Sequence, residues 1–138
     1  MQTRKEAQYM DTLAAVSARL AALGYTVTDA DNAALDYNIR KAETYLKAST
    51  NQPEVPEGLF YVWADMAAGL FLTDKKASGG LADIYDFEAP AKSISEGDTS
   101  VTFALSDSGS FEQQFDTMLE RMIHPDEELV TAFRRLAW

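Results

Sequence analysis

The sequence contains no cysteine and only one histidine, His124. Without cysteine, the chain cannot form disulfide frameworks, thiolate zinc sites or cysteine nucleophiles. With a single imidazole, histidine-rich metal sites and most histidine-based acid–base mechanisms are also excluded. We therefore expect a protein that is not an enzyme, with no catalytic residues, no metal site and no cofactor.

Long apolar runs and positive charge are also scarce. No stretch of about 18 apolar residues occurs, and residues 1–6 lack the apolar core of a signal peptide, so no membrane association is expected. The chain has 12 Lys and Arg against 22 Asp and Glu, a net charge of −10. Because DNA binding requires cations that replace the phosphate counterions, sequence-specific DNA binding is not expected. A surface of this charge instead suits a passage along which DNA must not stick.

What the chain does contain is enough apolar material for one hydrophobic core, since 46% of its 138 residues are hydrophobic. The patterns predict one mainly α domain over 1–138, a small helical bundle around a central apolar helix, with an inserted β-hairpin or long loop. Helices are expected at about 7–23, 29–48, 56–76, 110–123 and 126–136, and the hairpin at about 92–105.

The first two helices are predicted from apolar spacing and from their ends. Leu13, Val16 and Leu20 recur at helical spacing, and Gly24 follows as a glycine that can end the helix with a positive φ. Thr28 or Asp29 can cap the second helix. These signals predict a helix–link–helix unit at the start of the chain.

The third helix is predicted to be central because apolar side chains cover most of its circumference. Gly69 in its interior is expected to permit close approach of a neighbouring helix. Asp65 is expected either to face the least buried side or to pair with a basic residue. The predicted core residues of this helix are Leu59, Val62, Trp63, Met66 and Leu70.

Residues 75–91 are interpreted as an exposed loop, after which the apolar period changes from helical to alternating. Val101 and Phe103 alternate with polar or small residues, and Gly97 with Asp98 supplies turn chemistry. This hairpin is expected to pack on the helices or on a neighbouring subunit, because an isolated hairpin is marginally stable. Ser110 is the expected cap of the fourth helix.

Three groups of residues are candidate sites. His124 near the acids 126–128 could bind a metal or act as a base, but a surface histidine is the favoured interpretation. The acids of 83–88 could collect a cation, but a solvated acidic loop is favoured. Arg134, Arg135 and Trp138 are residue types enriched at interfaces, and equally fit a helix end whose tryptophan folds onto the core.

Several segments, in order, resemble the head–tail connector proteins of tailed phages and prophages of Gram-positive bacteria. The most specific is residues 92–103, and segments 46–51 and 106–110 depart from the family pattern. The others that carry the resemblance are Leu23-Gly24-Tyr25, Val27-Thr28, Asp31, Val55-Pro56-Glu57-Gly58-Leu59, Asp65-Met66, Gly69, Phe71-Leu72, Lys75-Lys76, Gly80-Leu81 and Arg134-Arg135-Leu136-Ala137-Trp138.

The resemblance implies a structural neck protein of the virion, made in the host bacterial cytoplasm. Copies would form a ring that joins the portal protein of the head to the tail, extends the DNA channel and docks a downstream neck or tail-completion protein. The oligomer or portal interface expected from this comparison comprises Lys92, Ser93, Ile94, Glu96, Gly97, Asp98, Thr99, Arg134, Arg135 and Trp138.

The alternative function from the residues alone is an acidic mimic of DNA that inhibits a nuclease or restriction enzyme. Its support is the net charge of −10. Such a mimic is expected to carry long stripes of carboxylates, whereas the 12 cations here are interspersed with the acids. A small hydrolase that uses Asp65 or His124 is the least supported alternative, because no nucleophile–base pair is apparent.

Overall fold

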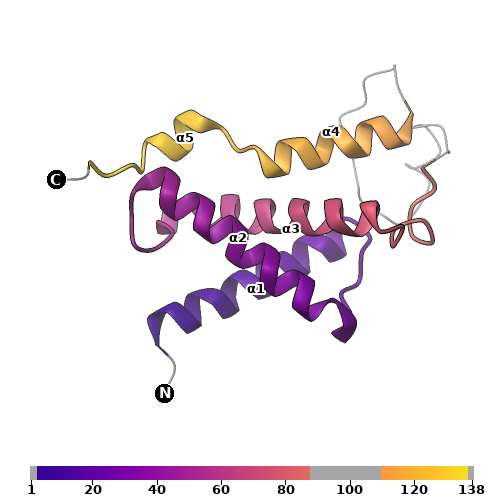
Figure 1. Ribbon diagram of the computed structural model, residues 1–138, viewed down its shortest axis with the longest axis horizontal. Helices are drawn as coiled ribbons and strands as arrows, with labels where there is room; N and C mark the ends of the chain where they lie inside the picture. Colours follow the sequence, from indigo (N-terminus) through magenta and orange to yellow (C-terminus); the bar gives the residue numbers. More distant parts are fainter. Residues whose placement is uncertain (1–2, 88–109, 137–138) are drawn as a thin grey trace.

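The computed structural model describes residues 3–87 and 110–136, and its regular elements are helical. In Figure 1, α3 runs through the middle of the molecule, α1 and α4 lie on opposite sides of it, and α2 crosses it. The predicted mainly α class is confirmed, whereas the hairpin predicted at about 92–105 lies outside the described residues. The elements are α1 (Arg4–Ala22), the 3-10 helix η1 (Asp29–Asp31), α2 (Asn32–Thr50), the 3-10 helix η2 (Glu57–Leu59), α3 (Phe60–Ala77), α4 (Phe111–Ile123) and α5 (Glu127–Thr131).

Local capping interactions set the ends of these helices. Thr3 and Glu6 form a reciprocal capping box, so α1 begins one turn earlier than the apolar spacing predicts. Gly24 follows α1 with φ of 93°, which confirms the expected glycine-assisted end. Ser110 caps α4 as predicted, with Gln113 completing a second capping box.

The central helix α3 supplies much of the hydrophobic core. Leu59, Trp63 and Met66 are buried, whereas Val62 and Leu70 are partly buried and pack against the core. The Trp63 indole N–H donates to the Ile39 carbonyl of α2 at 2.8 Å. Tyr61 is 78% exposed, so α3 is not buried on every side and keeps one flank open to solvent.

The last predicted helix, 126–136, is wrong at its end, because α5 stops at Thr131. The N–H groups of residues 132–134 still bond to carbonyls of the preceding turn, and the next contacts are with the end of α2 and the residues after it. The Arg135 N–H donates to the Thr50 carbonyl at 2.8 Å, and the Gln52 side chain donates to the Phe133 carbonyl. The tail is thereby fixed against the end of α2.

The prediction that 75–91 is an exposed loop is only partly right for its described part, 75–87, in which most residues from 78 to 86 are exposed and lie in turns. Helix α3 continues to Ala77, and the following turn buries Leu81 and Tyr85. The Tyr85 N–H donates to the Leu81 carbonyl at 2.9 Å, so the turn satisfies its own backbone while it carries apolar side chains inward. Tyr85 packs against Phe115 of α4, with ring centroids 5.0 Å apart.

The close approach expected at Gly69 is confirmed and gives a testable prediction. A Cβ added there would lie 2.9 Å from Met122 Cβ and 3.1 Å from Ile123 Cγ1 of α4. Helix propensity alone predicts that Gly69→Ala stabilises the protein, by up to about 1 kcal/mol. We expect the opposite sign, a net loss of about 1–2 kcal/mol, because α3 and α4 must separate.

Urea unfolding followed by circular dichroism checks the sign for Gly69→Ala. A variant more stable than the original protein would show that α4 shifts away from α3 without cost, and would contradict this description of the contact.

Candidate functional site

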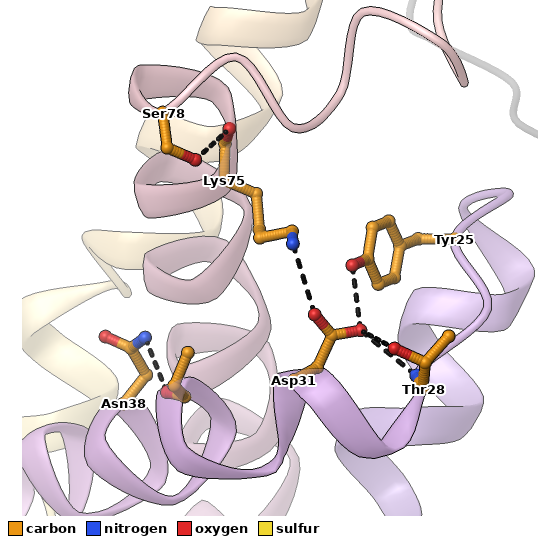
Figure 2. Close-up of polar contacts among 7 residues, drawn as sticks. Tyr25, Thr28, Asp31, Asn38, Lys75 and Ser78 are labelled. Atoms are coloured by element: carbon orange, nitrogen blue, oxygen red, sulfur yellow. Dashed lines mark hydrogen bonds and ion pairs between the residues drawn. The ribbon is translucent and has the colours of Figure 1, made fainter.

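Asp31 is a buried carboxylate at the junction between α1 and α2 (Figure 2). One oxygen, Oδ2, accepts hydrogen bonds from the Thr28 N–H at 3.0 Å and the Tyr25 hydroxyl at 2.8 Å. The other, Oδ1, accepts from Lys75 Nζ near the end of α3 at 3.1 Å. The carboxylate therefore connects the α1–α2 link to the central helix.

The surroundings of Asp31 favour its charged form. Burial by itself raises the pKa of the carboxyl group, but hydrogen bonds from Thr28, Tyr25 and Lys75 outweigh burial and lower the pKa below its ordinary value. In return, the hydrogen bond from Lys75 to Asp31 raises the pKa of that ammonium group. The pair is charged at neutral pH.

This carboxylate is better suited to holding the fold than to chemistry, since both oxygens are engaged by the protein's own donors. The sequence resemblance includes Asp31, but the sequence did not predict this network of contacts. The contact between Thr28 and Asp31 could be detected in the sequence, because the two residues stand at capping-box spacing. The contact with Lys75 could not be detected, because 44 residues separate the partners along the chain.

The two arginines predicted at the interface lie at the C-terminal end of α2. The Arg134 guanidinium donates to the Ser49 carbonyl at 3.1 Å, where a cation complements the negative end of the helix. The Arg135 carbonyl accepts from Asn51 Nδ2 at 3.1 Å, while both arginine side chains remain exposed. The other predicted interface residues, Lys92, Ser93, Ile94, Glu96, Gly97, Asp98, Thr99 and Trp138, lie outside the described residues.

An open hollow of about 990 Å³ lies where the tail, the start of α1 and the α2–α3 link meet. Arg4 and Arg135 line it, but so do Asp11, Glu54 and Glu57. Because charges of both signs face the hollow, its chemistry selects no single class of ligand.

The exposed face of α4 carries a row of carboxylates. Glu112, Asp116 and Glu120 follow one another at intervals of four residues, which places them on one side of the helix. Lys76 of α3 contacts the first two, at 3.2 Å from Glu112 and 2.6 Å from Asp116. The face is acidic but partly neutralised at one edge.

The exposed face of α2 has a different chemistry. Tyr37, Lys41 and Tyr45 also follow at intervals of four residues, and the tyrosines are 63% and 46% exposed. Among the described residues, no hydrogen bond or ion pair engages these three side chains. The row on α2 and the row on α4 are thus two exposed helix faces of different chemistry. Neither was predicted from the sequence as a site.

The candidate catalytic residues Asp65 and His124 do not share a site. Asp65 pairs with Arg19 at 3.1 Å, one of the two arrangements expected for it. His124 is exposed and directly follows α4, with its Nε2 3.4 Å from Glu120 of that helix. Within 3–87 and 110–136, no three acidic, histidine or cysteine side chains are grouped to hold a metal ion. In the same ranges, no helix has both the length and the apolarity needed to cross a membrane.

Comparison of the chain with models of protein families, with curated protein sequences and with solved structures finds no match.

Proposed function

We propose that this chain is a structural subunit of a phage head–tail junction, where copies form a ring that joins the portal protein to the tail. The observation that carries the proposal is the pair of unlike outer faces, one acidic on α4 and one aromatic on α2. A closed ring joins each copy to the next through two different surfaces, so a ring subunit requires such a pair. The resemblance of the sequence to phage connectors supports the same function.

The charge of the chain suits the proposed role of the ring as a section of the DNA channel. Each copy contributes −10, so a ring concentrates negative charge around its opening. DNA phosphates are repelled by such a collar, and DNA passes without sequence-specific binding. In this proposal the protein performs no reaction and requires no cofactor.

The proposal assigns the remaining predicted interface to docking within the virion. The hairpin expected at 92–105 packs against a neighbouring subunit or the portal. Arg134, Arg135 and Trp138 contact the portal or the downstream neck or tail-completion protein. The side chains of Arg134 and Arg135 are exposed where the tail lies against the end of α2, which supports a docking role for the tail.

Deleting the gene from the phage or prophage that encodes it tests the proposed function. We expect filled or leaky heads without tails in electron micrographs, and tailed particles again when the gene is supplied in trans. Normal tailed particles from the deletion strain would overturn the proposal.

Complementation with Arg135→Glu refines that test, because the Arg135 side chain holds no described hydrogen bond or ion pair. We expect the variant to fold with a stability within about 0.5 kcal/mol of the original. We also expect fewer tailed particles, since charge reversal weakens docking. A normal particle yield would remove Arg135 from the proposed interface.

The DNA-mimic alternative receives less support from the geometry. Two of the three carboxylates in the row on α4 are contacted by Lys76, which interrupts the single-sign stripe that a mimic needs. Recovery of a nuclease or restriction enzyme with the tagged protein from infected cells would favour that alternative.

A further inference from the structure

We infer that the row Tyr37, Lys41 and Tyr45 on α2 of one copy packs against the row Glu112, Asp116 and Glu120 on α4 of a second copy. The inference rests on the proposed function, since it names the two faces through which neighbouring copies of a ring would join.

The two rows match in geometry. Each occupies positions i, i+4 and i+8 of a helix, and so forms one of the ridges by which helices pack into one another's grooves. At a rise of 1.5 Å per residue, each row spans about 12 Å. Ridges of equal length allow the three positions of one row to lie opposite the three of the other.

The two rows also match in hydrogen-bonding chemistry. The tyrosine hydroxyls and the Lys41 ammonium group can donate, whereas ionised carboxylates only accept. Lys41 is central in its row and Asp116 is central in the other, so these two meet whether the helices run parallel or antiparallel. Lys76 contacts only Oδ1 of Asp116, and among the described contacts none engages Oδ2.

The face on α2 is unusual for so acidic a chain. With 22 carboxylates in the protein, this flank of α2 carries none: its row has two tyrosines and a lysine, and Ala34 and Ala48 lie on the same flank. Small residues beside exposed aromatics allow another helix to approach closely, and exposed tyrosines are typical of interfaces. The charge of this face therefore complements α4 of another copy.

A single α2–α4 contact leaves one face of each kind free in a dimer, whereas two copies that paired both faces reciprocally would stop at the dimer. Addition of further copies to the singly joined dimer then continues until the arrangement closes into a ring or extends as a filament. A face that paired with itself would stop at two copies.

Disulfide cross-linking tests this arrangement cleanly, because the chain has no native cysteine. The double variant Lys41→Cys with Asp116→Cys is oxidised at high protein concentration and separated on a denaturing gel. We expect a ladder of dimers, trimers and larger species. A matched control, Ala18→Cys with Asp116→Cys, moves one thiol to the exposed side of α1 and is expected to remain largely monomeric.

The outcomes separate this inference from the proposed function. A product that stops at the dimer, or a ladder no stronger than that of the control, overturns the inference that the row on α2 packs against the row on α4 of the next copy. A monomer without a ladder at every concentration overturns it as well. Tailless particles from the gene deletion would still support the proposed function in each case, whereas normal particles beside a clear ladder would overturn the function alone.

Charge reversal provides an independent measurement on the folded protein. We expect Lys41→Glu to raise the dissociation constant for self-association about tenfold or more, measured by sedimentation velocity. Lys41→Arg should retain association, and Lys5→Glu, which reverses an exposed lysine on α1, should not change it. Equal losses of self-association affinity in Lys41→Glu and Lys5→Glu would show a general charge effect and contradict the proposed contact between α2 and α4.

Discussion

Replacement of Trp63 by alanine is expected to lower the free energy of unfolding by about 3–5 kcal/mol. Trp63 lies on α3 at the centre of the bundle with 1% of its surface exposed. Its removal leaves a large cavity among residues of α2 and α3, and it also leaves the Ile39 carbonyl without its indole donor. Since domains of this size are stable by about 5–15 kcal/mol, the variant should be largely unfolded well below the melting temperature of the original.

Two comparisons make the Trp63 prediction specific. Tyr61→Ala removes another aromatic side chain from α3, but one that is 78% exposed, and should cost less than about 1 kcal/mol. Trp63→Phe keeps most of the apolar volume, so its loss in free energy of unfolding should lie between those of Trp63→Ala and Tyr61→Ala. Circular dichroism in urea gives all three values, and a Trp63→Ala variant as stable as Tyr61→Ala would contradict the central position of α3.

Replacement of Asp31 by alanine is expected to cost about 2–3 kcal/mol. The side chain is almost fully buried, and its loss leaves the Tyr25 hydroxyl, the Thr28 N–H and Lys75 without their acceptor. This cost is smaller than the cost of breaking a fully buried ion pair, because 28% of the Lys75 side chain is exposed and water can solvate its ammonium group. Thermal unfolding monitored by circular dichroism measures the effect.

The contribution of Asp31 should depend on pH in a defined direction. Its pKa is lower in the folded protein than in the unfolded chain, so the stabilisation is present above about pH 4 and is lost as pH falls below that value. The difference in stability between the original protein and Asp31→Asn should therefore be largest near neutral pH and shrink toward pH 3. The pKa of Lys75 is raised, so the stabilisation that its charged ammonium group contributes is lost only at strongly alkaline pH.

Asp29→Asn is the matched control for these measurements, because Asp29 belongs to the same short helix η1 but is exposed. We expect it to change stability by less than about 0.5 kcal/mol at any pH. If Asp29→Asn and Asp31→Asn had equal effects, the network drawn in Figure 2 would not be the source of the stability.

The features that could be predicted from the sequence were those encoded by neighbouring residues. Leu13, Val16 and Leu20 follow the helical period, and Gly24 and Ser110 are residue types that end and begin helices. These local signals account for the confirmed helices. The need for a glycine at position 69 was also visible, because an interior helical glycine is costly unless another helix approaches it.

The features that could not be predicted depend on contacts between distant parts of the chain. α5 ends early because residues near Arg135 bond to the end of α2, more than 80 residues away. Tyr85 is buried because the aromatic rings of α4 lie over it. The rows on α2 and α4 have a detectable spacing, but whether a face of a helix is covered or exposed follows only from the packing of the bundle.

The central claim is that this chain acts as one of many identical subunits assembled at the portal. Electron microscopy of the purified protein mixed with the portal protein of the same virus tests that claim most directly. We expect portal particles extended at one end by a ring of this chain, with an open central channel. Bare portals beside unassembled chains, at concentrations far above those in an infected cell, would contradict the account.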